Sequence, residues 1–268
     1  MEFVGDILSL DRPATREFNL LGASLPSSKD VYFRSKQKEI IEQYTAARIF
    51  MNETENTDWD HWFTRVEQEE AQQYFELTFK AYFYEVALTY YNIVVDLSWT
   101  TCYLATEFAL THQGVRINFG GIRPIEEAFE LMRKAENLVT NPNAEENPFG
   151  YLKGMCPEFS TAIEMIISFW SWYGQSNIRQ MYNFCKHKGK PMYTEIQELS
   201  GPSFMGFFQE DRNGNSVQLV SDPSDMRLQC SLEESIKELL HFDNMQLFPY
   251  ISNLFAELER VLSPSPFV

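Results

Sequence analysis

"FELTFKAYFYEVALTYYNIVVDL", residues 75–97, carries the strongest secondary-structure signal in the chain. Its apolar side chains recur at spacings of three and four residues, the period with which one face of an α-helix repeats. The repeat positions are Phe75, Phe79, Tyr82, Val86, Tyr90, Ile93 and Leu97. The repeat predicts a long helical region from about Trp59 to Ala109. An unbroken helix of this size would extend about 70 Å, so we expect a bend or break within it.

Further helices are predicted on both sides of this stretch. Ser27–Asp30 places Ser at a cap and Asp30 in a first turn, which predicts a helix that ends near Met51. The apolar face of that helix would consist of Ile40, Ile41, Tyr44, Ala47 and either Ile49 or Met51. Later helices are expected from Pro124 to Val139, from Pro157 to Gly174, from Gln175 to Lys188, and from Leu232 to Leu262 with a break before Pro249.

A small β element is expected near residues 204–230. The apolar runs FMGFFQE and SVQLVS flank Asn213–Gly214, a residue pair typical of a hairpin turn, and MRLQCSL is a candidate third strand. The predicted fold is therefore all-α (mainly α), a helical bundle with a small β-hairpin insert. The expected parts are an irregular N-terminal arm at 1–27, the bundle at 28–200, the insert at 201–230, and a C-terminal helix packing on the bundle at 231–268.

The composition indicates a folded and strongly acidic protein. Its 268 residues are 44% hydrophobic and 15% aromatic, which is enough to bury a large core. The formal net charge of −16 argues against non-specific binding of duplex DNA, which depends on distributed Lys and Arg. The four cysteines are scattered without Cys-x-x-Cys spacing, which argues against zinc. We expect a cytoplasmic protein with free thiols, without metal, cofactor, signal peptide or membrane span.

Positive charge gathers in one helical stretch, IRQMYNFCKHKGKP, residues 178–191. At about 100° per residue, Arg179, Asn183, Lys186 and His187 share one broad stripe of the predicted helix. Such a stripe can hold a phosphate, because Arg supplies a planar fork of donors and His transfers a proton near neutral pH. The alternative is a solvated basic face near a helix C-terminus, where Lys and His interact favourably with the helix dipole.

This arrangement resembles the HEPN superfamily (higher eukaryote and prokaryote nucleotide-binding domains). The resemblance consists of Arg179 and His187 with seven residues between them, the local sequence KHKG, and a preceding Trp- and Tyr-rich helix at Thr89–Glu107. It covers about Ser28–Gly189 and implies a HEPN-like up-and-down helical bundle. It further implies a metal-independent endoribonuclease, in which the RNA 2′-hydroxyl attacks its own phosphate. His187 would then move a proton and Arg179 would stabilise charge on the phosphate.

Five more residues are candidates for this site. Four belong to the basic stretch and are expected to bind the RNA substrate: Asn183, Lys186, Lys188 and Lys190. Asp96 is the candidate supporting residue, because a carboxylate inside the apolar run VVDLSW is costly to bury unpaired. One role for Asp96 is to orient Arg179 or His187 from a facing helix. A structural ion pair or a helix cap is the other.

The resemblance also implies partners. Two HEPN subunits often meet at their motifs, so a homodimer around one RNA strand is expected, acting in stress response, toxin–antitoxin pairs or antiphage defence. An antitoxin or defence-complex protein is then an expected partner. The alternative is a non-catalytic HEPN-like module that binds a nucleotide, RNA or protein within a larger complex. Three features favour it: the gap between Arg179 and His187 is longer than usual in the family, Gln180 stands where Asn, Asp or His is usual, and the chain is acidic overall. A third hypothesis is a structural subunit whose aromatic surface serves assembly.

Overall fold

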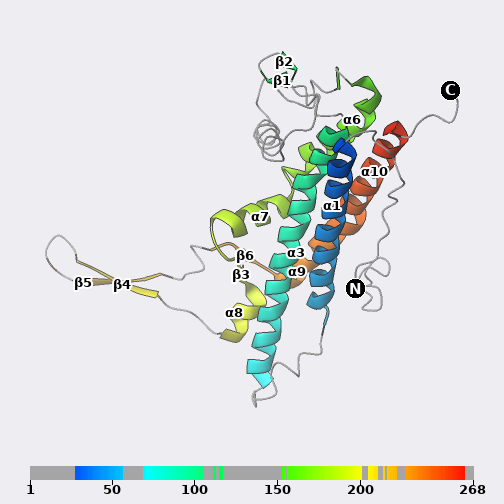
Figure 1. Cartoon of the computed structure of the whole chain (residues 1–268). Coiled ribbons are helices and arrows are strands. Elements are labelled where there is room, and N and C mark those ends of the chain that lie inside the picture. The colour runs from blue at the N-terminus through cyan, green and yellow to red at the C-terminus, as the bar shows by residue number, and fades with distance from the viewer. Residues whose placement is uncertain are drawn as a thin grey trace, which may run out of the picture. The chain divides into compact units, whose positions relative to one another are not determined.

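The protein is mainly α-helical, as the sequence predicts (Figure 1). The computed structural model describes residues 28–56, 69–105, 111–112, 115–116, 153–154, 156–200, 205–210, 214, 216–221 and 227–262. The expected N-terminal arm and the expected helix from Pro124 to Val139 lie outside the described residues.

The helices follow most of the predicted boundaries. They are α1 (Ser28–Thr54), α3 (Glu69–Ala105), η2 (Pro157–Phe159), α6 (Ser160–Tyr173), α7 (Asn177–His187), α8 (Thr194–Ser200), α9 (Leu232–Phe242), η4 (Asp243–Leu247) and α10 (Phe248–Leu262). The starts at Ser28 and Pro157 and the interruption at Gly174 are confirmed. Of the predicted apolar face of α1, Ile40, Tyr44, Ala47 and Met51 are buried, Ile41 is half-buried and Ile49 is 41% exposed. The buried residues of α1 also include four polar ones, Gln37, Arg48, Asn52 and Thr54.

α3 runs without interruption over 37 residues, so the expected break does not lie between Glu69 and Ala105. The apolar repeat recognised in the sequence is not its most buried face, because Phe75 and Tyr82 are 40% and 49% exposed. The fully buried side chains lie on roughly the opposite side of the helix; they include Ala81, Tyr84, Leu88, Tyr91 and Val95. A helix that is apolar on both sides gives a clear helical period without identifying the side that packs.

The C-terminal helical run is continuous from α9 through η4 to α10, and η4 is a π-helical segment. It lies directly before Pro249, where a break is predicted. Proline lacks a backbone N–H, and its ring clashes with the carbonyl four residues earlier, here Met245. The wider π turn avoids that clash, so the predicted break takes the form of a π segment.

The predicted hairpin is confirmed. β4 (Met205–Glu210) pairs antiparallel with β5 (Ser216–Ser221), in a register that places Phe207 opposite Leu219. Gly214 in the connection has φ of +79°, a left-handed conformation that favours glycine.

The third strand predicted from MRLQCSL forms, but not in this hairpin. β6 (Gln229–Cys230) pairs parallel with β3 (Met192–Tyr193), and the amide of Met192 donates to the carbonyl of Leu228 at 2.9 Å. This pairing is non-local, so the sequence pattern did not reveal it. A further antiparallel pair joins β1 (Thr111–His112) to β2 (Val115–Arg116).

The chain divides into two compact units. The first unit contains the described residues within 46–89 and 177–242, and therefore α7, α8 and α9. The second unit contains those within 28–45, 90–176 and 243–262, including α6 and α10.

In the second unit a buried carboxylate joins three helical segments. Asp243 of η4 is fully buried, and its two carboxylate oxygens accept hydrogen bonds from Tyr44 of α1 (2.5 Å) and Tyr91 of α3 (2.9 Å). The two tyrosine rings also pack edge to face, with centroids 5.9 Å apart. Because a buried carboxylate is costly unless it is hydrogen-bonded, these contacts fix α1 and α3 relative to η4.

Aromatic side chains complete the core of this unit. Phe169 of α6 stacks on Tyr250 of α10 with ring centroids 3.8 Å apart and an interplanar angle of 7°. The hydroxyl of Tyr250 bonds to that of Ser98 at 2.9 Å, and the hydroxyl of Tyr173 donates to the side chain of Asn92. Tyr250 and Tyr173 therefore each combine apolar burial of the ring with a hydrogen-bonded hydroxyl.

We expect Tyr91→Phe to lower the free energy of unfolding by about 1–3 kcal/mol, because it removes one hydrogen bond from a buried carboxylate. Tyr74→Phe on the same helix is the control, since the Tyr74 hydroxyl has no hydrogen-bond partner among the described residues. Urea denaturation at neutral pH measures both values. Equal stability of the two variants would contradict a structural role for Asp243.

Candidate functional site

The basic stretch ends a helix as predicted. α7 covers Asn177–His187, and the amides of Lys188 and Gly189 both donate to the carbonyl of Phe184, at 2.8 and 3.1 Å. Gly189 has φ of +129°, a conformation that favours glycine, and Pro191 cannot continue the helix. The cations of the last turn therefore lie at the negative end of the helix dipole.

Arg179 and Lys186 lie beside the same aromatic ring. The guanidinium carbon of Arg179 is 5.4 Å from the centroid of Tyr182, and the ammonium nitrogen of Lys186 is 5.6 Å from it. Tyr182 itself is buried. Cation–π contacts of this kind contribute about 0.5–1 kcal/mol at exposed sites, so the ring helps to keep two cations on one side of α7.

The side chains of Lys186, His187 and Lys188 are exposed and adjacent in sequence. In the part of the chain that the structure describes, none of them forms an ion pair with a carboxylate. This contrasts with Lys36, Lys237 and other described lysines, which pair with glutamates. A patch of unneutralised cations at a helix end attracts anions.

A groove of about 800 Å³ lies between α7 and α9. Its lining residues are Asn177, Gln180, Met181, Asn183, Phe184, His187, Lys188, Leu228, Cys230, Ser231, Glu234, Ser235 and Glu238. Three of the predicted site residues, Asn183, His187 and Lys188, therefore meet in one groove. Arg179 and Lys186 are not among the lining residues and lie at Tyr182 instead. The predicted stripe is therefore split. Asn183 and His187 line the groove, whereas Arg179 and Lys186 lie beside Tyr182, outside the groove lining.

The opposite wall of the groove is acidic, which the sequence analysis missed. Glu234 and Glu238 of α9 both line it. Glu238 accepts a hydrogen bond from the side-chain amide of Asn177 at 3.0 Å, and Glu234 pairs with Lys237 at 2.9 Å. Their spacing of four residues indicates a shared helix face, but only the packing of α9 on α7 places that face in the groove.

Lys190 is bound to α3 in the first unit. Its ammonium nitrogen lies 3.7 Å from a carboxylate oxygen of Glu85 and 3.8 Å above the centroid of Tyr82. The hydroxyl of Tyr193 donates to the same oxygen of Glu85 at 3.0 Å. These contacts anchor the segment after α7. Asp96 lies in the second unit and is half-buried, so its proposed support of the basic site stays a prediction.

The cysteines near the groove are not activated nucleophiles. Burial, together with the nearby Glu85 and Cys230 groups, raises the pKa of the Cys185 thiol to about 11. Burial likewise raises the pKa of Cys230, which lines the groove. Because the thiolate is the reactive form, the raised pKa lowers the reactivity of both thiols at neutral pH.

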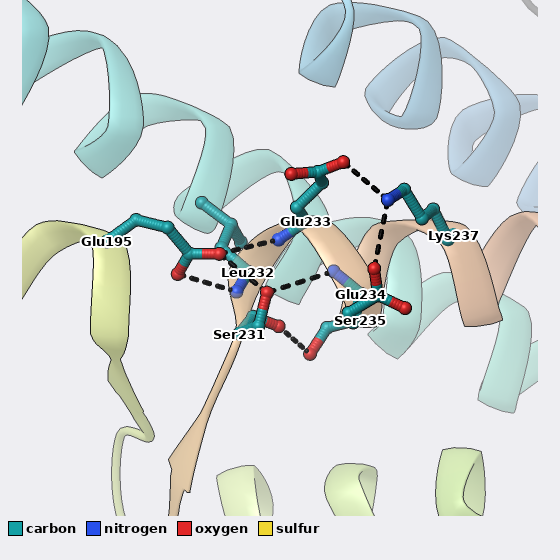
Figure 2. A network of polar contacts seen from close by, with 7 residues as sticks. All are labelled: Glu195, Ser231, Leu232, Glu233, Glu234, Ser235 and Lys237. Atoms are coloured by element: carbon teal, nitrogen blue, oxygen red, sulfur yellow. Dashed lines mark hydrogen bonds and ion pairs between the residues drawn. The ribbon is translucent and has the colours of Figure 1, made fainter. Parts of the chain in front are cut away.

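Glu195 positions the start of α9 (Figure 2). The hydroxyl of Ser231 donates to its carboxylate at 2.6 Å, and the amides of Leu232 and Glu233 donate to it at 2.9 and 3.2 Å. Burial favours the protonated form of Glu195, but these hydrogen bonds outweigh it and lower the pKa to about 2. An ionised carboxylate therefore satisfies the free amides at the positive end of α9 and fixes one wall of the groove.

No family model, curated protein or solved structure matches the chain. The described residues contain no group of three or more His, Cys, Asp or Glu side chains placed to hold a metal ion. No helix among them is long and apolar enough to cross a membrane. Functional inference therefore rests on the geometry of α7 and its groove.

Glu195→Gln is expected to lower the free energy of unfolding at pH 7 by about 1 kcal/mol, the usual cost of losing a helix cap. The folded pKa lies below the unfolded value, so this stabilisation is present above about pH 4.3 and is lost as the pH falls toward 2. Urea denaturation at several pH values measures the difference. Glu198→Gln, on the same helix, is the control. A difference that does not change with pH would contradict the assignment.

Proposed function

We propose that this chain binds single-stranded RNA at the basic end of α7 and cleaves it without a metal ion, as an endoribonuclease of HEPN type. The observation that carries the proposal is the exposed cluster Lys186–Lys188, which forms no ion pair with a carboxylate among the described residues, in a chain of formal net charge −16. General acidity repels a polyanion, so RNA is expected to bind at a local cluster of basic residues such as this one. Asn183 beside the cluster adds an amide that can donate to phosphate.

The proposed reaction needs two groups, and α7 carries both. His187 accepts the proton of the RNA 2′-hydroxyl as that oxygen bonds to phosphorus, and the same proton then passes to the departing 5′ oxygen. The bond between phosphorus and that 5′ oxygen breaks, which leaves a 2′,3′-cyclic phosphate and a 5′-hydroxyl. Arg179 stabilises the charge that develops on the phosphate. Because Arg179 lies at Tyr182 and His187 lines the groove, the phosphate would lie across the edge of α7 between them.

The proposal also includes the oligomeric state, the cellular role, a regulatory partner and the location of the protein. A homodimer whose α7 ends meet would double the positive charge around one RNA strand. Activity in stress response, toxin–antitoxin pairs or antiphage defence, control by a partner protein and a cytoplasmic location follow from the HEPN resemblance and stay predictions.

A second candidate is a non-catalytic module that binds RNA or a nucleotide. The observation that favours it is the division of the predicted stripe: His187 lines the groove, whereas Arg179 does not. The carboxylates of Glu234 and Glu238 in the same groove also disfavour a bound phosphate near them. Binding and cleavage are therefore tested separately.

For binding, we expect Lys186→Ala to weaken the affinity for single-stranded RNA. It should also reduce the slope of log K against log salt by about 0.7, the value for one lost phosphate contact. Lys38→Ala removes an exposed charge from α1, where Lys38 lies 3.5 Å from Glu42, and is the control. Fluorescence anisotropy with labelled RNA over a salt series measures both. If the two variants lose the same affinity, the interaction is a general charge effect and α7 is not the site.

For cleavage, we expect His187→Ala to reduce the rate about 10²–10⁴-fold, the usual contribution of a general acid–base group. Arg179→Ala should reduce it as well, with binding largely retained. The assay uses a chelator, and mass spectrometry identifies the cyclic phosphate. His241→Ala is the control, because His241 is an exposed histidine at the end of α9 and does not line the groove.

The outcomes separate the two candidates. Cleavage that survives both substitutions would refute the assignment of Arg179 and His187. Salt-sensitive binding without any cleavage by the native chain would favour the non-catalytic module.

A further inference from the structure

The groove between α7 and α9 has an acidic end as well as a basic one. Asn177 begins α7 and bonds to Glu238, whereas His187 ends α7 and lines the groove together with Cys230, which precedes α9. The two helices therefore run in opposite directions along the groove. At 1.5 Å per residue, the two ends of α7 are about 15 Å apart, so a ligand along the groove meets cations at one end and carboxylate at the other.

Glu238 is the carboxylate best placed to meet a ligand. The side-chain amide of Asn177 donates to one of its oxygens at 3.0 Å, which restricts its orientation. A carboxylate has about four acceptor positions, so this bond leaves both oxygens able to accept more. Glu234, one turn earlier, is instead engaged with Lys237. Glu238 forms no ion pair among the described residues.

The lining between the two ends suits a flat, partly apolar group. Met181 and Phe184 supply apolar surface from α7, and Leu228, which is 39% exposed, supplies it from the segment before α9. The volume of about 800 Å³ falls within the range of pockets that bind small ligands. Unstacked RNA bases bind proteins in this way, with apolar contacts to their faces and hydrogen bonds to their Watson–Crick edges.

We propose that Glu238 selects guanine in the RNA that binds at the basic end of α7; this rests on the proposed function. A carboxylate only accepts hydrogen bonds. Guanine presents two adjacent donors on its Watson–Crick edge, the N1–H and the exocyclic amine. Adenine and cytosine each place a ring acceptor beside their amine, and uracil places carbonyl oxygens on both sides of its N–H. Guanine is therefore the base whose edge pairs with both oxygens of one carboxylate.

The experiment measures the affinity for single-stranded RNAs that differ only at one position, occupied by guanine, adenine, cytosine or uracil. The native chain is expected to bind the guanine RNA about tenfold more tightly than the others, a ratio typical of a bidentate base contact. Glu238→Gln should move the preference from guanine to adenine and cytosine, because a carboxamide offers one donor and one acceptor, which match the amine and the ring acceptor of both bases. Glu198→Gln, a carboxylate of α8 outside the groove, should keep the guanine preference.

Four outcomes decide between the proposal, its premise and their alternatives. Equal affinity for all four RNAs, or a Glu238→Gln variant that binds all four more tightly by the same factor, overturns guanine selection and leaves RNA binding intact. Absence of binding to every RNA and to GMP overturns the proposed function and guanine selection together. Binding of GMP alone, lost in Glu238→Gln, supports guanine recognition and assigns the groove to a free nucleotide instead of RNA.

Discussion

The buried carboxylate of Asp243 is the constraint on which the second unit depends. Removing a carboxylate from water costs several kcal/mol unless hydrogen bonds replace the lost hydration. Tyr44 and Tyr91 supply such bonds from α1 and α3. A shift of either helix along its axis would break a bond to the charged group, so Asp243 fixes the register of both helices as well as their proximity. Asp243 belongs to η4, the π-helical segment before Pro249. The irregular turn of the helix therefore also supplies the carboxylate that contacts α1 and α3.

Carboxylates in the first unit are satisfied in the same manner. Glu195 accepts from the hydroxyl of Ser231 and from two amides at the start of α9. Glu85 accepts from Tyr193 and lies near Lys190. An acidic chain thus uses hydroxyls, amides and a few lysines to stabilise carboxylates in its interior and at its helix ends. The basic residues at the end of α7 differ from these groups, because Lys186, His187 and Lys188 form no ion pair with a carboxylate among the described residues.

Local sequence patterns predicted the helices well, and their packing less well. The period of three and four residues revealed α3, but α3 is apolar on both sides, and its small residues, such as Ala81, lie on the side that packs. On α1 the pattern identified the buried apolar residues Ile40, Tyr44, Ala47 and Met51, but not the buried polar residues, such as Arg48 and Asn52. The pairing of β6 with β3 joins segments far apart in the chain, and no local signal specifies such a pairing.

The same limit applies to the candidate site. A helical projection placed Arg179 and His187 on one broad stripe, and α7 has that register. It could not show that Tyr182 would hold Arg179 outside the groove, or that Glu238 would face the groove from a helix about fifty residues later. The position of Arg179 at Tyr182 and of Glu238 in the groove changes which ligands the site can bind. Cations alone bind any polyanion, whereas a groove that also presents a carboxylate repels any ligand that cannot donate hydrogen bonds to it. The basic end of α7 would then supply affinity, and the acidic end would supply selection.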